Sequence, residues 1–289
     1  MLQSVSRSSW IIYLLLTVIW GGAFILIKKS LITFSATEVG LIRVSISFLF
    51  LTGFYFSRKP KFSKKDWWNI SIVGLLGSTI PVFLFAFAQK QVPSFLAGMI
   101  NALTPIWSAL IAFIIYKQTF KRTSWMGLAI GFFGALVLFY QPDSTIELSF
   151  GMLLVVLASL CYSISANIID KRLKHVKPLD IASGSFMVVG LPALLLSFFC
   201  IDWVSLDYQN SEVWFSIFSL IFLAVMATSV GLILFNKLMQ QSNIVFTTSI
   251  TYVLPIVAIL FGLLDGEIVS LTQYLGIGII LIAVYLVKK

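Results

Sequence analysis

The chain has 289 residues, of which 59% are hydrophobic and only 11% are charged, and its mean hydropathy is +1.01. Soluble domains carry about a quarter charged residues, so this composition excludes a soluble globular protein. A formal net charge of +9 is compatible with a nucleic-acid-binding protein, but the positions of the basic residues indicate orientation in a membrane instead.

Apolar runs follow one another along the whole chain, each near the 20-residue length that a helix needs to cross a hydrocarbon core of about 30 Å. No stretch shows the alternation typical of a transmembrane barrel, and helices satisfy their own backbone hydrogen bonds in lipid. The sequence therefore predicts an all-α membrane protein with ten transmembrane helices, at 10–27, 36–56, 67–88, 93–116, 124–140, 150–169, 180–201, 213–236, 244–264 and 271–287.

The first two runs each carry a residue of functional interest. The run at 10–27 is too long for an ordinary signal peptide and lacks a small-residue cleavage site, so it is predicted to remain as the first span. Trp20 lies near its end. The second run contains Arg43, the one basic residue well inside a predicted span. An ionisable side chain there costs about 2.5–3.5 kcal/mol on insertion scales and is a functional candidate.

Two interpretations of Arg43 are open: a structural side chain that reaches the interface or bonds free carbonyls, and a substrate contact. No Asp or Glu lies clearly within a predicted span, and proton-driven carriers commonly use such a carboxylate. The protein is therefore either a facilitator or a carrier coupled through residues nearer the surface, such as Glu38 or Glu267.

Prolines interrupt the fourth and ninth runs. Pro105 and Pro255 lie 255 − 105 = 150 residues apart, and each removes a backbone donor and kinks its helix. The carbonyls freed in this way are tolerated where neighbouring groups or a water-filled cavity satisfy them. A single kink is readily explained by packing, whereas a matched pair favours two helices that face a common cavity and bend.

Polar residues lie one helical turn before each proline: Asn101 precedes Pro105 by four residues, and Thr251 precedes Pro255 by four. Interhelical hydrogen bonding is the structural alternative for each polar residue. Together with nearby aromatic residues, they predict a lining for a mostly uncharged or zwitterionic ligand. The predicted substrate-binding residues are Trp20, Asn101, Thr104, Tyr162, Asn167, Thr248, Thr251 and Tyr252.

Other residues are given structural or solvent roles. Gly127 and Gly131 form a G-x-x-x-G pattern that suits close helix packing. Cys161 and Cys200 lie inside predicted spans and are interpreted as small apolar residues. The single histidine, His175, lies in a basic loop and is predicted to be solvated and without a partner. The sequence predicts no metal and no cofactor.

The basic residues follow a positive-inside pattern. With the N-terminus in the cytoplasm, sixteen of the 20 Lys and Arg residues fall in predicted cytoplasmic segments, whereas only Lys28, Lys29 and Lys90 face the other side. Acidic residues lean outward. This asymmetry predicts that both termini are cytoplasmic, and it disfavours a nucleic-acid-binding surface.

The two halves of the sequence resemble each other. Aligning Pro105 with Pro255 places "TPIWSALIAF" over "LPIVAILFGL". At the front of each half, "WGGAFILIKK" from Trp20 lies over "YSISANIIDKR" from Tyr162. Similarity of this kind at a fixed offset indicates duplication.

Each half contains five predicted spans, and an odd number requires the second half to enter the membrane from the opposite side. The loop at 117–122 is basic, whereas its equivalent contains Asp265 and Glu267. Equivalent loops of opposite charge are expected for inverted repeats, a common plan of secondary transporters. The predicted repeats are residues 1–141 and 149–289.

Several motifs resemble those of the EamA-type transporters of the drug/metabolite transporter superfamily. They are "WGGAF" from Trp20, Arg43 in the second span, "ALTPIWSALIA" at 102–112 and "GEIVSLTQYLGIGIILIAVYLV" at 266–287. The resemblance covers essentially the whole chain. It departs from the family pattern at Ala23, where Asn is usual, and at Lys117-Gln118, where the first half usually has Gly-Glu.

The resemblance implies ten spans in two repeats and the export or uptake of small organic solutes, commonly amino acids. We therefore expect a secondary transporter in the inner (plasma) membrane that exports small organic metabolites such as amino acids by alternating access around a central cavity. A passive facilitator or channel is the alternative. An intramembrane enzyme is disfavoured because convergent catalytic groups are lacking. The expected partners are a small-molecule substrate and the lipid bilayer; a monomer would suffice to form the cavity.

Overall fold

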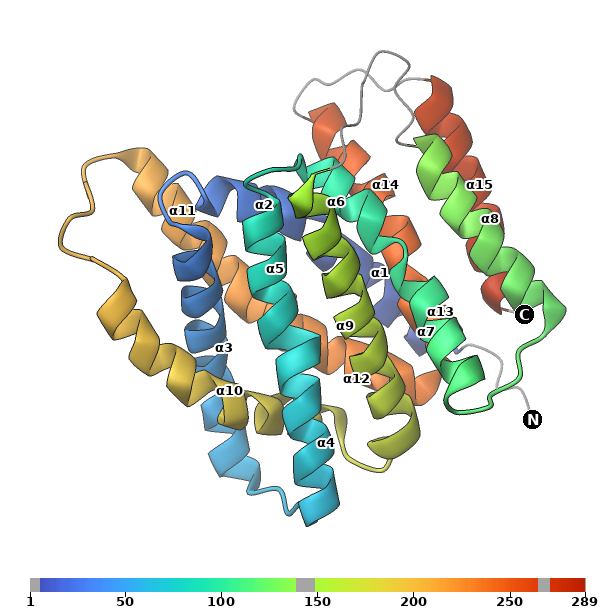
Figure 1. Ribbon diagram of the computed structural model, residues 1–289, viewed down its shortest axis with the longest axis horizontal. Coiled ribbons are helices and arrows are strands. Elements are labelled where there is room, and N and C mark those ends of the chain that lie inside the picture. Colours follow the sequence, from blue (N-terminus) through green and yellow to red (C-terminus); the bar gives the residue numbers. More distant parts are fainter. Residues whose placement is uncertain (1–5, 139–148, 265–270, 289) are drawn as a thin grey trace.

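The computed structural model describes residues 6–138, 149–264 and 271–288, and the regular elements in these ranges are all helical. Helices interrupted within one apolar run are numbered separately (Figure 1). In order they are α1 Arg7–Gly21, α2 Ala23–Ser30, α3 Ala36–Arg58, α4 Lys64–Gly74, the π-helix η1 Leu75–Thr79, α5 Ile80–Ala88, α6 Ser94–Asn101, α7 Thr104–Ile114, α8 Arg122–Leu138, α9 Phe150–Arg172, α10 Pro178–Cys200, α11 Ser211–Phe222, the π-helix η2 Leu223–Val230, α12 Gly231–Gln241, α13 Ile244–Thr248, α14 Ile250–Leu264 and α15 Leu271–Lys288.

Seven helical stretches are long and apolar enough to cross a membrane: Arg7–Ser30, Ala36–Arg58, Lys64–Ala88, Leu96–Ile114, Phe150–Arg172, Pro178–Cys200 and Ser211–Gln241. Shorter apolar helices occupy Arg122–Val137, Ile244–Val257 and Tyr274–Val287. All of these stretches coincide with runs predicted from the sequence. The prediction of an all-helical membrane protein is confirmed.

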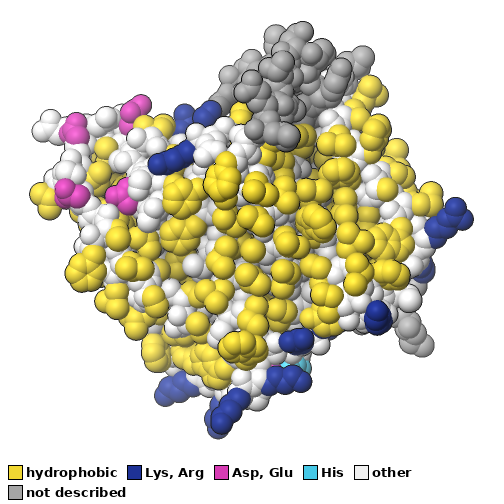
Figure 2. Space-filling view, in the orientation of Figure 1, with side chains coloured by type: hydrophobic (Ala, Val, Ile, Leu, Met, Phe, Trp, Pro, Cys, Tyr) yellow, Lys and Arg dark blue, Asp and Glu magenta, His cyan; other side chains and the backbone are white. Residues whose placement is uncertain are grey.

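The outer surface carries the apolar side chains that such a protein must present to lipid. Phe133, Leu195 and Phe218 are each more than half exposed. Figure 2 shows hydrophobic side chains over most of the face, with Lys and Arg mainly along the lower and right-hand edges and Asp and Glu at the upper left. An exposed apolar surface of this extent is unusual for a soluble monomer and fits a lipid-facing belt.

The helices pack in pairs that join the two halves of the chain. Helix α3 lies along α10, and α8 lies along α15 (Figure 1). Helix α9 packs against α5 and α7, while α1 packs against α12 and α14. The core therefore runs through the centre of the bundle, where α1 and α9 are each surrounded by helices of both halves.

Glycines on α8 allow close helix contact, as the G-x-x-x-G pattern predicts. A Cβ at Gly127 would lie 2.8 Å from a methyl of Val287 on α15, and one at Gly131 would lie 2.6 Å from the ring of Tyr252. Real Cβ contacts are not this short, so both positions require glycine for the observed packing.

Helix interruptions lie near the prolines but not at equivalent positions. The fourth run is interrupted at Ala102 and Leu103, directly before α7, which carries Pro105 in its first turn. The ninth run is interrupted at Ser249, six residues before Pro255, which lies inside α14. The Ser249 hydroxyl donates to the carbonyl of Phe246 at 2.7 Å. Such side-chain bonds to the backbone compete with the helical ladder and account for the earlier break.

Candidate functional site

A cavity of about 130 Å³ lies between helices of both halves of the chain. One water molecule needs about 10–15 Å³ of a volume measured in this way. The cavity therefore has room for about ten water molecules or one small organic molecule. Its wall is formed by α1, α2, α3, η1 and α5 to α7 of the first half and by α9, η2 and α12 to α14 of the second half.

Most of the predicted site residues line this cavity. They come from seven different helices that meet at the centre of the bundle, and their side chains are buried or half-buried. The predicted residues found in its wall are Trp20, Arg43, Asn101, Thr104, Tyr162, Thr248 and Thr251.

Asn167 and Tyr252 lie outside the cavity wall. The amide of Asn167 donates to the carbonyls of Ser108 on α7 at 3.1 Å and Ser163 at 2.9 Å. The Tyr252 hydroxyl donates to the carbonyl of Leu128 on α8 at 2.9 Å. Successive residues of a helix point about 100° apart, so Tyr252 faces away from the side that Thr251 presents. For these two residues the structural alternative, hydrogen bonding between helices, is what the structure shows.

Pro105 and Pro255 also lie outside the wall, but each is next to a residue that forms it. Thr104 precedes Pro105 and Leu254 precedes Pro255, and both Thr104 and Leu254 line the cavity. The Thr104 hydroxyl donates to the side-chain oxygen of Asn101 at 3.1 Å. The prolines therefore lie beside the wall of the cavity and do not form it.

Arg43 is the charged residue in the described wall of the cavity. Its side chain is buried, with 7% of the residue exposed. One terminal nitrogen, Nη2, donates to the hydroxyl oxygen of Thr228 in η2 at 3.1 Å. The Nε group is buried and makes no hydrogen bond to any residue that the structure describes. The guanidinium therefore has a donor without a partner among the described residues, and Arg43 lines a cavity whose described wall contains no Asp or Glu.

The π-helices η1 and η2 contribute wall residues that the sequence prediction missed, namely Gly77, Ser78, Ala227 and Thr228. The Thr79 hydroxyl donates to the carbonyl of Gly74 at 3.1 Å, and the Ser229 hydroxyl donates to that of Ala224 at 2.9 Å. Each bond spans five residues, which suits the wider turn of a π-helix. Single-turn π segments inside α-helices are frequent at functional sites.

A sequence signal for these segments does exist. "GST" at 77–79 and "ATS" at 227–229 are clusters of small and hydroxyl residues inside apolar runs. They are 150 residues apart, the same separation as Pro105 and Pro255. Extending the proline alignment toward the N-terminus would have found them.

Aromatic rings supply much of the apolar wall. The ring centres of Trp20 and Phe235 are 5.5 Å apart, and those of Phe24 and Phe85 are 5.7 Å apart. Tyr162 stacks on Phe85 with centres 6.1 Å apart. The indole nitrogen of Trp20 donates to the carbonyl of Ala227 at 2.8 Å. Because its polar atom is held by η2, Trp20 offers the cavity an apolar ring.

A family model described as the EamA-like transporter family matches residues 8–140 and again residues 149–288. These two matches together cover nearly the whole chain. The chain belongs to the EamA-like transporter family.

Relatives of this EamA-like transporter include bacterial proteins named as transporters or as an efflux pump. An uncharacterized transporter of Synechocystis sp. is 25% identical over 94% of this chain and 87% of its own length. The uncharacterized inner membrane transporter YedA of Escherichia coli is 24% identical over 94% and 88%. A probable amino-acid metabolite efflux pump of Salmonella typhimurium is 22% identical over 97% and 95%.

A solved crystal structure shares the fold of this EamA-like transporter. The two superpose with a TM-score of 0.75 over 97% of this chain and 96% of the other, at 16% sequence identity. At this identity the likeness extends to the fold alone.

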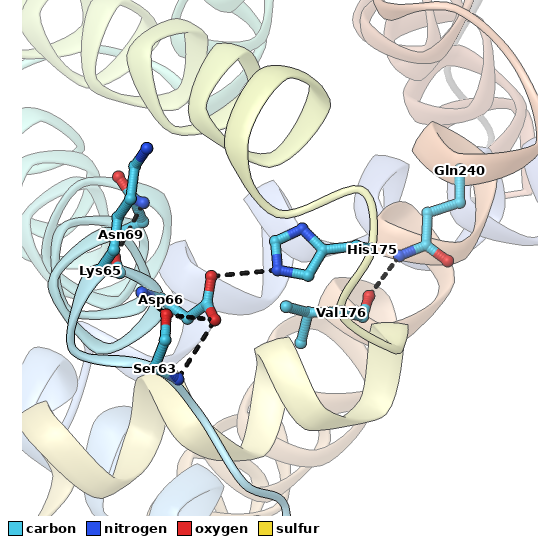
Figure 3. Close-up of polar contacts among 7 residues, drawn as sticks. All are labelled: Ser63, Lys65, Asp66, Asn69, His175, Val176 and Gln240. Atoms are coloured by element: carbon cyan, nitrogen blue, oxygen red, sulfur yellow. Dashed lines mark hydrogen bonds and ion pairs between the residues drawn. The ribbon is translucent and has the colours of Figure 1, made fainter.

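The loop between α9 and α10 holds His175, and its predicted isolation was wrong. A ring nitrogen of His175 lies 3.1 Å from a carboxylate oxygen of Asp66, whose other oxygen caps α4 through Ser63. Figure 3 shows this contact beside a hydrogen bond from the amide of Gln240 to the carbonyl of Val176. Asp66 and His175 are 109 residues apart, so only the folded chain brings them together.

Glu38 was considered in the sequence as a surface-near coupling residue. In the structure one of its carboxylate oxygens accepts a hydrogen bond from the backbone nitrogen of Ser35 at 2.7 Å, completing a capping box at the start of α3. It is not part of the cavity wall. Glu267, the other candidate, lies outside the described residues.

Proposed function

We propose that this EamA-like transporter is a secondary carrier that exports small organic metabolites such as amino acids by alternating access around the central cavity. The observation that best supports this function is the composition of the cavity wall, to which both halves of the chain contribute residues at matching positions. The name of the Salmonella relative, a probable amino-acid metabolite efflux pump, supports the direction and the substrate class.

The wall residues occur in pairs at constant separations, which supports two inverted five-helix repeats at residues 1–141 and 149–289. Rocking of one half against the other around a site shared by both is the usual alternating-access motion of inverted repeats. Pairs 150 residues apart are Gly77 and Ala227, Ser78 and Thr228, Val82 and Leu232, Phe85 and Phe235, Asn101 and Thr251, and Thr104 and Leu254; pairs 142 apart are Trp20 and Tyr162, Ala23 and Ser165, and Ile27 and Ile169.

Helix packing supports the same symmetry. Helices α3 and α10, which pack on each other, are the second spans of the two halves, and α8 and α15 are the fifth. The first span of each half packs against the third and fourth spans of the other half. Helix α9 of the second half contacts α5 and α7, and α1 of the first half contacts α12 and α14. Such reciprocal contacts are expected of a pseudo-two-fold axis through the cavity.

The orientation is proposed from charge. Basic residues gather on the side of the loops that contain Lys61 and His175, whereas Asp202, Asp207 and Glu212 lie in or beside the α10–α11 loop on the opposite side. The positive-inside rule then places both termini and the basic loops in the cytoplasm, with ten crossings. The inner (plasma) membrane is the proposed location.

The test is counterflow in proteoliposomes, which separates a carrier from a channel. Vesicles loaded with unlabelled amino acids and small aromatic metabolites are diluted into a trace of labelled compound. A carrier transiently accumulates the label, whereas a channel only equilibrates it. We expect accumulation with the wild type and a loss of at least tenfold in initial rate with Asn101→Ala and Thr251→Ala.

Thr52→Ala is the matched control, because Thr52 bonds only the carbonyl of Phe48 in its own helix and does not line the cavity. Accumulation that survives in both cavity variants would refute the site. Equilibration without accumulation would refute the carrier mechanism and favour a channel.

A further inference from the structure

We propose that Arg43 recognises a carboxylate on the transported molecule, and that the substrates are small carboxylic acids with an apolar or aromatic body. An ammonium group on the same molecule is not required. This inference rests on the transport function proposed above and names the substrate class of the same cavity.

The first observation is that the guanidinium of Arg43 is buried and only partly hydrogen-bonded. Arg43 is 93% buried, donates one hydrogen bond to the neutral hydroxyl oxygen of Thr228, and leaves Nε without a partner among the described residues. A buried cation is costly unless it is paired and its donors are satisfied. Arg43 therefore has both a charge and a donor to offer to a ligand.

The second observation is where the described carboxylates are used. Asp66, Asp170 and Asp180 each lie within 3.2 Å of a basic side chain other than Arg43. Glu38 caps α3, and Asp202 and Asp207 accept hydrogen bonds from backbone nitrogens of the α10–α11 loop. Glu212 lies in the exposed first turn of α11. Within residues 6–138, 149–264 and 271–288 no carboxylate pairs with Arg43, so an anion from outside the chain fits this position.

The third observation is the chemistry of the rest of the wall. An ammonium group would need a carboxylate or several converging carbonyls, and the described wall holds no acidic side chain. The rings of Trp20, Phe85 and Phe235 instead offer contact to an apolar body. Arg guanidinium presents a planar fork that matches a carboxylate, so the combination selects an organic acid.

The position of Arg43 breaks the symmetry of the cavity. Helices α3 and α10 have equal length and are offset by 142 residues, so Ser185 is the counterpart of Arg43. The Ser185 hydroxyl bonds the carbonyls of Ile70 and Ile181 and does not line the cavity. Among the described residues, the wall therefore has one cation where a duplicated arrangement would supply two or none. A single cation suits the binding of one carboxylate per transport cycle.

The experiment measures ligand binding to the purified full chain by isothermal calorimetry, with four probes that share a phenyl group. They are 3-phenylpropionate, phenylalanine, phenylalanine amide and phenethylamine. We expect 3-phenylpropionate and phenylalanine to bind with dissociation constants within about tenfold of each other. The amide and the amine are expected to bind at least tenfold more weakly, which corresponds to about 1.4 kcal/mol.

Arg43→Gln tests the assignment directly. It is expected to weaken the binding of 3-phenylpropionate at least tenfold and to leave the weak binding of the amide unchanged, while Arg43→Lys keeps an intermediate affinity. If Arg43→Gln does not fold, the preference of the wild type for acid over amide still decides the matter. Competition by sodium chloride as effective as that by 3-phenylpropionate would show a site for simple anions and would overturn the proposal.

Equal binding of acid, amide and amine would also overturn it, as would binding of none of the four probes. Neither result would contradict the carrier function, because the counterflow experiment described above tests that function separately. Counterflow that fails for every compound while 3-phenylpropionate still binds at Arg43 would refute the transport proposal and keep the carboxylate site.

Discussion

Polar side chains inside this protein differ in what their hydrogen-bonding groups face. The amide of Asn167 is directed at two backbone carbonyls, so it joins α9 to α7. Asn101 lines the cavity and accepts a bond from its neighbour Thr104. Two asparagines of equal chemistry therefore have different expected roles, one in stability and one in binding.

This difference predicts opposite phenotypes for two alanine substitutions. Asn167→Ala removes one hydrogen bond to α7 and one within α9. Hydrogen bonds between helices are worth about 0.6–1.7 kcal/mol in membrane proteins. The substitution should therefore lower the thermal unfolding temperature in detergent and leave the KM for transport unchanged. Asn101→Ala should raise the KM and change the unfolding temperature little. Identical effects of the two substitutions would contradict the separation.

At the scale of elements, the hydrophobic runs predicted the helices well because each run is long and bounded by polar loops. The assignment of faces was harder. A helix that is apolar nearly all round gives no amphipathic stripe to orient it, so Tyr252 was assigned to the same site as Thr251 although it faces α8. The π-helices were missed because their backbone pattern has no hydrophobic period, and only the repeat at 150 residues marks them.

Contacts between segments far apart in the chain also could not be predicted from the sequence. Asp66 lies in the first turn of α4, whereas His175 lies in the loop between α9 and α10. Their pairing depends on how α4 and the α9–α10 loop are placed by the packing of α10 on both α3 and α4. In contrast, Asn101 and Thr251 could be predicted as wall residues because each lies four residues before one proline of a matched pair.

Packing between α8 and its neighbours gives a second prediction. Gly131→Ala places a methyl 2.6 Å from the fully buried ring of Tyr252, and overpacking of this kind costs about 1–3 kcal/mol. We expect a clear drop in unfolding temperature. Gly278→Ala on α15 is the control, since nothing lies within 4 Å of its Cβ position and alanine favours a helix by about 1 kcal/mol over glycine. Equal destabilisation by both would argue against close packing at Gly131.

At the scale of the whole molecule, the two ends of the helix bundle differ in charge. The loop carrying Val204 lies among acidic residues, and the loop carrying Lys61 lies among basic ones. The orientation proposed from this difference in charge can be measured from either side of the membrane.

Cysteine labelling in intact cells is the measurement. In a background with Cys161→Ser and Cys200→Ser, Val204→Cys should react with a membrane-impermeant maleimide from outside, because Val204 is 93% exposed. Lys61→Cys should react only after the membrane is permeabilised. The background without cysteine serves as the blank. Labelling of both positions from the same side would refute the proposed topology.

The unmatched pair Arg43 and Ser185 has a consequence for the resting state. In the alternating-access cycle proposed above, identical halves would relate the inward-open and outward-open forms by symmetry and give them equal free energies. A single charge in α3, bonded across to η2, has different surroundings in the two forms and removes this degeneracy. In the proposed cycle, the empty protein then favours one of the two forms, and the pair Arg43 and Ser185 contributes to that preference.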